Sequence, residues 1–262
     1  MERAIKSAVD YVDEIIVIHD GPCVDRSLEI ASKYGCIVRE STRQGNCEAH
    51  LIEGLNAAKN DWILKLDGDE YLSKELAESL YSLTSRPSAD IYEFSIPTRE
   101  NGKKYTFLYF PRLYRKSKIK YINVIHQYTD PIDRSATIKR RDFVIEHDPK
   151  YDNFEIKRFI KKQTPWAKSH AQKLLSDTAS LEMYNTNTFD WPLRTRLRIM
   201  FPLILGMLGS FLYHITVGIK NTVKYKDFYF LKHSFFTGIY FVMVFFIVFI
   251  RKLKRLLWGT YE

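Results

Sequence analysis

Residues 67–70 read Asp-Gly-Asp-Glu and carry the side chains that metal chemistry requires. They end a predicted strand at 61–66, and Asp20 follows another short apolar run at 15–18. Ligand sites of parallel sheets lie at the carboxyl ends of the strands, where both acidic segments fall. The hard cations Mg²⁺ and Mn²⁺ prefer carboxylate oxygens and keep phosphate oxygens as further ligands. The pattern therefore predicts a Mg²⁺ or Mn²⁺ site at Asp67 and Asp69.

A metal held by these carboxylates would neutralise the charge that develops on a departing diphosphate. This is the main electrostatic requirement of sugar transfer, because the nucleoside diphosphate leaves as an anion. An Asp-Gly-Asp turn after a strand is also ordinary turn chemistry, so the motif alone leaves a structural role open. The neighbouring Glu70 and the second aspartate, Asp20, favour the metal site.

Alternating strands and helices must position these carboxylates. Short apolar runs predict strands at 15–18, 36–38 and 61–66, and helical periodicity predicts helices at 1–11, 26–34, 45–59 and 74–83. Ser73 is the expected N-cap of the last of these helices. Elements of this length and order imply right-handed βαβ units, and therefore an α/β domain with a mostly parallel, Rossmann-like sheet and flanking helices.

Residues 91–144 have a different character, with aromatic strands expected at 91–97 and 105–114 around an Asn-Gly turn. This region is strongly basic, through Arg99, Lys103, Lys104, Arg112, Arg115, Lys116, Lys118 and Lys120. A solvated face, a nucleic-acid surface, and a surface for anionic lipid or a phosphorylated acceptor all remain open. The apolar tail that follows favours lipid or acceptor, so no nucleic-acid partner is expected.

Two apolar stretches of the tail, 199–219 and 234–250, are flanked by basic residues on all sides. Their length predicts a helical hairpin in a membrane or two helices lying in its interface. A buried helical core or a dimer interface is the alternative. The positive-inside rule does not fix an orientation here. We expect the tail to hold the chain at the cytoplasmic face of a membrane, near a lipid-linked acceptor.

Cysteine content and charge narrow the choice of cellular compartment and of binding partners. The three cysteines, Cys23, Cys36 and Cys47, have no CxxC spacing, so the sequence predicts neither a disulfide framework nor a zinc site, and a reducing compartment fits. The net charge of +9 favours anionic partners.

The chain is expected to fall into three parts. Residues 1–150 would form the α/β domain and 191–262 the membrane-associated helices. Residues 151–190 would form a helical connector, whose pattern at 153–181 is interrupted at Pro165.

Three segments resemble family 2 glycosyltransferases, which have the GT-A fold. Residues 12–21, VDEIIVIHDG, resemble the family's DEIIVVDDGS-D segment, and residues 61–70, DWILKLDGDE, resemble its A-gdwil-lDaDE segment. Residues 112–115, RLYR, with 124–126, VIH, are similar to the RLfR…vHE stretch of the branch that contains lipopolysaccharide-core glucosyltransferases. The resemblance covers about residues 1–150 and implies a GT-A-like domain that binds a nucleotide sugar.

The resemblance also implies roles for single residues. Asp20 would contact the nucleobase or ribose of the donor. Asp67 and Asp69 would hold the ribose and the metal–diphosphate, with Asp69 the more direct metal ligand. Glu70 would lie beside the acceptor or brace the site. His126 would approach the metal or the diphosphate.

Other candidates for these roles are present. His147 is a second candidate for the role of His126. An inverting transfer needs a carboxylate that deprotonates the acceptor hydroxyl, and Glu70, Glu93 and Glu100 are all available.

The sequence departs from the family pattern at several positions. His19 replaces the first aspartate of the usual pair, and residues 22–24 replace a Ser-Thr turn with one extra residue. Gln127 stands where the branch usually has glutamate. The strand and loop that open the family's domain are not found before the first helix, so we expect the chain to lack its first strand.

Together these observations predict a metal-dependent glycosyltransferase. It would move a hexose-type sugar from a nucleoside diphosphate to an envelope glycolipid or polysaccharide precursor, with inversion implied by the resemblance. An inactive membrane-associated GT-A-like scaffold or fragment is the first alternative. A nucleotidyltransferase is the second, although the Gly-rich basic loop of such enzymes is not found.

Overall fold

The computed structural model describes residues 1–100, 103–126, 129–148, 155–176, 181–186 and 190–258, without the side chains of 98–109, 134, 139 and 141. The side chains of Arg99, Lys103, Lys104 and the candidate base Glu100 are therefore not described, and the predicted Asn-Gly turn at 101–102 and the departure at Gln127 lie outside the described residues. The chain forms two compact units. The first comprises Met1–Asp152 with Glu182–Asn187, and the second comprises Asn153–Leu181 with Thr188–Glu262.

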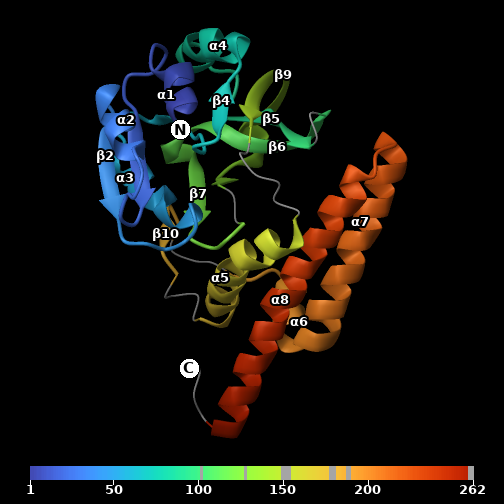
Figure 1. Ribbon diagram of the computed structural model, residues 1–262. Coiled ribbons are helices and arrows are strands. Elements are labelled where there is room, and N and C mark those ends of the chain that lie inside the picture. Colours follow the sequence, from blue (N-terminus) through green and yellow to red (C-terminus); the bar gives the residue numbers. More distant parts are fainter. Residues whose placement is uncertain (101–102, 127–128, 149–154, 177–180, 187–189, 259–262) are drawn as a thin grey trace. The chain divides into compact units, whose positions relative to one another are not determined.

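The first unit is a mixed α/β domain, in which strands and helices alternate over the first half (Figure 1). Its elements are α1 Glu2–Ala8, β1 Ile16–Asp20, α2 Ser27–Lys33, β2 Ile37–Ser41, η1 Glu48–His50, α3 Leu51–Ala57, β3 Trp62–Leu64, β4 Glu70–Leu72, α4 Lys74–Ser85, β5 Ile91–Glu100, β6 Lys103–Arg115, η2 Lys116–Lys118, β7 Ile119–Ile122, β8 Asp130–Pro131, η3 Arg134–Ala136, β9 Thr137–His147 and β10 Met183–Tyr184. The α/β class that the sequence predicts is confirmed.

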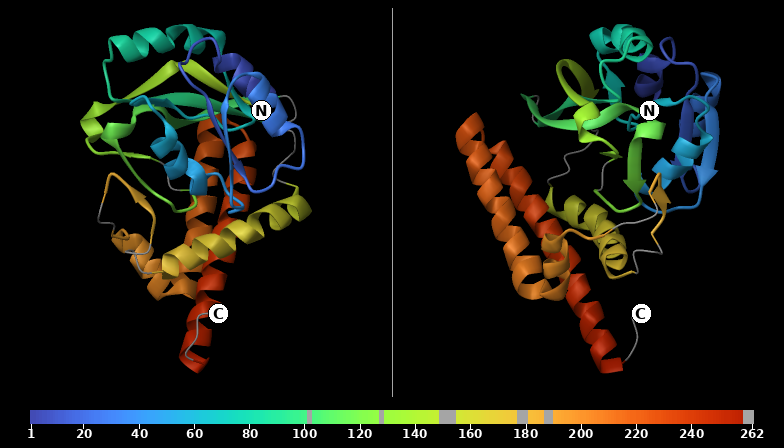
Figure 2. Two further views of the ribbon diagram at one scale, coloured as in Figure 1. Left: turned by 90° about the vertical axis from the view of Figure 1, so that its left-hand side faces the viewer. Right: turned by 180° about the vertical axis from the view of Figure 1, so that it is seen from behind.

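The strands pair in three sheets. β1 and β2 form a parallel pair (Figure 2). Asp20 lies opposite Ser41 in this pair. The largest sheet has the order β3-β6-β5-β9-β4, and a third has the order β10-β7-β8. Among the described pairings, β1–β2 and β5–β9 are parallel and the other five are antiparallel.

The sheet is thus less parallel than the sequence predicts. β5 ends at Glu100 and β6 begins at Lys103. So short a connection allows only an antiparallel neighbour, since a parallel one needs a crossover of about a dozen residues or more.

One apolar core supports the largest sheet. Leu76 and Leu80 of α4 pack with Tyr92, Phe94 and Ile145 of the sheet, and all five are 4% exposed or less. Burying a large apolar side chain contributes about 1.5–3 kcal/mol relative to leaving it exposed. This cluster therefore fixes α4 and the strand β4 that leads into it.

The largest sheet also anchors both ends of residues 65–69, the acidic segment. β3 pairs with Leu113–Arg115 of β6, and β4 pairs with Ile145–His147 of β9. Residues 65–69, which contain Asp67 and Asp69, connect these two anchored strands. The amide of Lys65 donates to the carbonyl of Arg112 at 2.8 Å, and the amide of Asp148 donates to the carbonyl of Asp69 at 3.1 Å.

The second unit is helical. It consists of α5 Ile156–Leu175, α6 Leu193–Met200, the π-helical turn η5 Pro202–Leu208, α7 Gly209–Tyr225 and α8 Tyr229–Trp258. The predicted interruption at Pro165 is wrong, because α5 runs through it. Phe159, Ala167 and Ala171 of α5 are buried against α8, and this packing offsets the one backbone hydrogen bond that proline removes. The predicted connector is also divided, since β10 belongs to the first unit.

Helices α7 and α8 lie side by side and approach closely at glycines (Figure 2). A Cβ added at Gly218 would lie 2.7 Å from the Cβ of Ser234, and one at Gly238 would lie 2.9 Å from the ring of Phe211. At Gly206 it would lie 2.6 Å from the ring of Phe245. Small residues at such contacts let helix backbones approach, as they do in membrane helix pairs.

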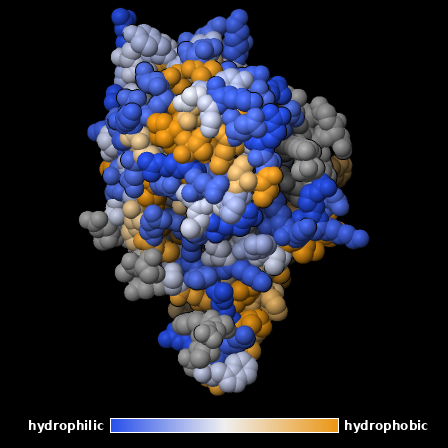
Figure 3. Space-filling view, turned by 60° about the vertical axis from the view of Figure 1, so that its left-hand side comes forward, coloured by the Kyte–Doolittle hydropathy of each residue, from blue (hydrophilic) through white to orange (hydrophobic). Residues whose placement is uncertain are grey.

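Pro202–Tyr225 and Tyr229–Trp258 are long and apolar enough to cross a membrane, by length and composition. In their most apolar windows only 22% and 39% of the residues are buried. On the face that Figure 3 shows, hydrophobic residues lie at the surface among hydrophilic ones. Core helices of soluble proteins are mostly buried, so these helices resemble membrane helices more closely.

Candidate functional site

Asp67 lies in a network of two cations and a second carboxylate. Its Oδ1 accepts from the Lys65 ammonium at 2.9 Å, and its Oδ2 lies 3.4 Å from the Arg112 guanidinium. Arg112 also donates to Glu70 Oε1 at 2.6 Å, and Glu70 Oε2 accepts from the Asp67 amide at 2.9 Å. Arg112 thus links two acidic residues of the site, Asp67 and Glu70.

The interior of this network is buried. The side chain of Arg112 is 8% exposed and that of Glu70 is 4% exposed, whereas that of Asp67 is 34% exposed. Burial opposes ionisation of Asp67, but Lys65 and Arg112 outweigh it and lower its pKa to about 2. Burial raises the pKa of Glu70 against the attraction of Arg112. Asp67 is therefore a fixed anion, and Glu70 a buried partner of Arg112.

Asp69 is more open than Asp67. Its side chain is 49% exposed, and its Oδ2 lies 3.4 Å from His147 Nε2 at the end of β9. The hydrogen bond from His147 is the main cause that lowers the pKa of Asp69. Its carboxylate is accessible and ionised, as a metal ligand must be, and its oxygen donors suit Mg²⁺ or Mn²⁺. The acidic segment thus fits the cation that the sequence predicts.

The two candidate histidines lie in different places. His147 contacts Asp69 directly, while His126 follows β7 and its amide donates to Glu48 Oε1 at 3.3 Å. The backbone at His126 is left-handed, with φ 62°. The contact at 3.4 Å therefore places His147 beside Asp69.

Asp20 ends β1, as predicted, and binds three donors. It accepts from the amides of Gln44 at 2.5 Å and Gly45 at 2.8 Å and from His50 Nε2 at 2.8 Å. Burial opposes the ionised form, but these hydrogen bonds lower the pKa of Asp20. Asp20 therefore holds the loop before η1 in place. This loop, residues 42–47, overlaps the beginning of the helix that the sequence predicts at 45–59, and the observed helices begin later, at Glu48 and Leu51.

Sequence reasoning missed three residues of this region. Lys65 and Arg112 neutralise Asp67, and His50 contacts Asp20, but each contact of Arg112 and His50 joins residues 30 or more positions apart. Arg112 carried one signal, its place in the RLYR segment. Nothing in the local pattern identifies His50.

Comparison with known proteins agrees with this geometry. Residues 1–145 match the sequence profile of Glycosyl transferase family 2. An uncharacterized glycosyltransferase of Rickettsia felis is 28% identical over 202 residues, which cover 71% of this chain and 69% of the relative. One of Rickettsia bellii is 31% identical over 138 residues, covering 49% of this chain and 46% of the relative.

A further relative carries a more specific name. The cholesterol galactosyltransferase of Borreliella burgdorferi is 29% identical over 157 residues, covering 55% of this chain and 41% of the relative. The profile match spans more than half of the chain and includes β1, the acidic segment and β6. The chain therefore belongs to glycosyl transferase family 2 and is a glycosyltransferase.

Proposed function

We propose that this glycosyltransferase is metal-dependent and uses a nucleoside-diphosphate sugar as donor, with Asp69 as the direct metal ligand. The half-exposed carboxylate of Asp69, on a segment anchored by strands at both ends, carries this proposal. Mg²⁺ or Mn²⁺ bound there would neutralise the charge of the diphosphate. Asp67, held by Lys65 and Arg112, would contact the donor ribose beside it, and Asp20 the nucleobase or ribose.

The buried pair of Glu70 and Arg112 favours a bracing role for Glu70. The resemblance allowed either contact with the acceptor or support of the site. With its side chain 4% exposed and 2.6 Å from Arg112, Glu70 is better suited to hold Asp67 than to take a proton from an incoming hydroxyl. Glu93 and Glu100 stay candidates for the base of an inverting transfer, and His126 stays a candidate for contact with the diphosphate.

The acceptor that fits best is a lipid-linked saccharide or envelope glycolipid at the cytoplasmic face of a membrane. Two observations support this part of the proposal. The second unit presents two helices of membrane-spanning length, flanked by arginine and lysine. The name of the Borreliella relative specifies a lipid, cholesterol, as the acceptor of that protein.

Binding of nucleoside diphosphates and nucleotide sugars to the detergent-purified full-length chain tests the proposal. Calorimetry with and without Mn²⁺ should show binding that requires the metal and is lost in Asp69→Asn. Asp133→Asn, a change on an exposed turn, serves as the matched control and should bind like the unmodified chain. Binding that ignores both the metal and the Asp69 change would contradict the proposed role. Absence of any nucleotide binding would instead favour an inactive scaffold.

A further inference from the structure

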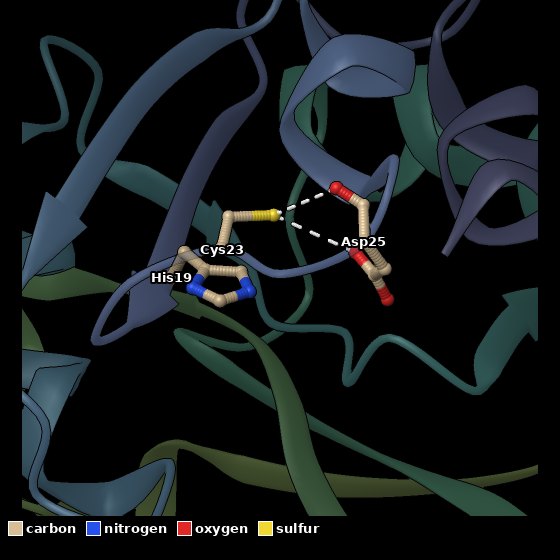
Figure 4. A group of neighbouring side chains, drawn as sticks. All are labelled: His19, Cys23 and Asp25. Carbon is tan, nitrogen blue, oxygen red and sulfur yellow. Dashed lines mark hydrogen bonds between the residues drawn. The ribbon is translucent and has the colours of Figure 1, made fainter.

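The end of β1 and the loop after it bring together three side chains of different chemistry (Figure 4). His19, Cys23 and Asp25 each offer one ligand atom, and these atoms all lie within 4.8 Å of one another. Cys23 Sγ lies 3.5 Å from Asp25 Oδ1. We propose that His19, Cys23 and Asp25 form a site for a transition-metal ion such as Zn²⁺, separate from the Mg²⁺ or Mn²⁺ site at Asp69.

The backbone holds the loop in this shape. Gly21 has φ 82°, a conformation that favours glycine, and its amide donates to the carbonyl of Ser41 at 2.9 Å. The Cys23 amide donates to Glu40 Oε2 at 3.2 Å. Both bonds attach the loop to β2, so the turn that brings Cys23 back toward His19 is fixed by its neighbours.

The imidazole of His19 makes the hydrogen bond that metal-binding histidines commonly make. Its Nδ1 lies 2.7 Å from the carbonyl oxygen of Gly21, which can only accept a hydrogen bond. Nδ1 therefore carries the proton, and in the neutral ring the lone pair lies on Nε2. Metal-binding histidines commonly show this arrangement, in which the second ring nitrogen donates to a backbone carbonyl or carboxylate.

The carboxylate of Asp25 is held in place by the residue two positions on. Its Oδ1 accepts from the Ser27 amide at 2.8 Å. Because the side chain is exposed, an ion could reach it from solvent.

The separation of the sulfur and carboxylate donors suits a small tetrahedral ion. With Zn–S near 2.3 Å and Zn–O near 2.1 Å, tetrahedral geometry places sulfur and oxygen roughly 3.6 Å apart. The observed 3.5 Å between Cys23 Sγ and Asp25 Oδ1 is close to that value. Three protein ligands leave one position for water, which is the pattern of open zinc sites.

The donor set also separates this site from the one at Asp69. Thiolate and imidazole favour Zn²⁺ or Co²⁺, whereas sites made of carboxylates alone favour Mg²⁺ and Mn²⁺. Binding through Cys23 would release the thiol proton to solvent, because the thiolate is the ligating form.

Titration of the full-length chain with Co²⁺, followed by absorbance, tests the site without any nucleotide. Thiolate bound to Co²⁺ gives a ligand-to-metal charge-transfer band in the near ultraviolet, so binding of one equivalent should produce this band. Zn²⁺ should displace the Co²⁺, and excess Mg²⁺ should not. Asp25→Asn and His19→Gln should weaken binding by about tenfold or more, while Cys23→Ser should abolish the band.

Cys36→Ser and Cys47→Ser are the matched controls, and each should retain the band. Circular dichroism would verify that every variant is folded. A folded chain that gives no band, or a band that survives in Cys23→Ser and disappears in Cys47→Ser, would overturn the assignment. Since no donor is added, these outcomes are independent of the proposed transferase mechanism.

Discussion

Arg112 is the residue on which the acidic site most depends. It is buried and donates both to Glu70, which is more deeply buried, and to Asp67, which faces the site. Removing one partner of a buried pair leaves an uncompensated charge, and that is costlier than replacing both partners with apolar groups.

Arg112→Gln should therefore lower the free energy of unfolding by about 3–5 kcal/mol. The double change Arg112→Leu with Glu70→Leu should recover much of this loss, because neither charge then remains buried. Urea unfolding of the purified chain measures the free energy of unfolding of both variants. Arg26→Gln is the control, since that side chain is 73% exposed and should contribute little. A loss no larger than that of the control would show that the pair does not stabilise the site.

Among single residues, the sequence predicts the carboxylates of the site better than the distant side chains that contact them. Asp20, Asp67 and Asp69 follow strands, and each can be found from its local pattern. His147 and Arg112 reach the same segment from β9 and β6, more than 40 positions away in the chain. No local periodicity encodes which distant side chain will neutralise a given carboxylate.

Among the elements, α4 has the clearest beginning. Ser73 Oγ accepts from the Leu76 amide at 3.2 Å, which confirms the predicted N-cap. The helix follows β4 directly, and its Leu76 and Leu80 lie in the core beneath the largest sheet. Its cap therefore helps to hold the end of the acidic segment.

Ser73→Ala should cost about 1 kcal/mol of unfolding free energy, the usual value for loss of an N-cap. Ser79→Ala, the same change within the same helix, should be neutral or slightly stabilising. There the hydroxyl donates to the Glu75 carbonyl, and alanine is the better helix former. Thermal unfolding of the two variants under the same conditions compares their losses of stability. Equal losses would show that the cap contributes nothing.

The elements that sequence reasoning missed are short or paired at long range. β4 has three residues and begins with Glu70, so neither length nor composition marks it as a strand. It exists because β9 pairs with it. Helix α4 and the long strands β5 and β6, by contrast, follow strong local patterns and are confirmed.

At the scale of the whole molecule, the second unit depends on close contact between helices. Gly218 lies against Ser234 and the backbone of Leu231, where an added Cβ would be 2.7 Å and 3.2 Å away, respectively. An added methyl group could not be accommodated there without moving α7 from α8.

Gly218→Ala should therefore destabilise the helical unit by roughly 1–3 kcal/mol, the usual cost of overpacking. Gly209→Ala is the matched change in the same helix. An added Cβ there approaches only the carbonyl of Ile204, at 3.4 Å, and helix propensity should offset the contact. Thermal loss of helical circular dichroism in detergent compares the two variants. A Gly218→Ala chain as stable as Gly209→Ala would mean that the helices do not pack as described.

The pairing of β4 with β9 also sets an order of events during synthesis. The acidic segment leaves the ribosome with residues 65–69, but its second anchor and His147 emerge more than 70 residues later. Before β9 has emerged, the largest sheet is incomplete and Asp69 has no contact with His147. A nascent or truncated chain that ends before residue 145 would thus expose the carboxylates without assembling the site. The ability to bind a donor would be acquired only once this unit is nearly complete.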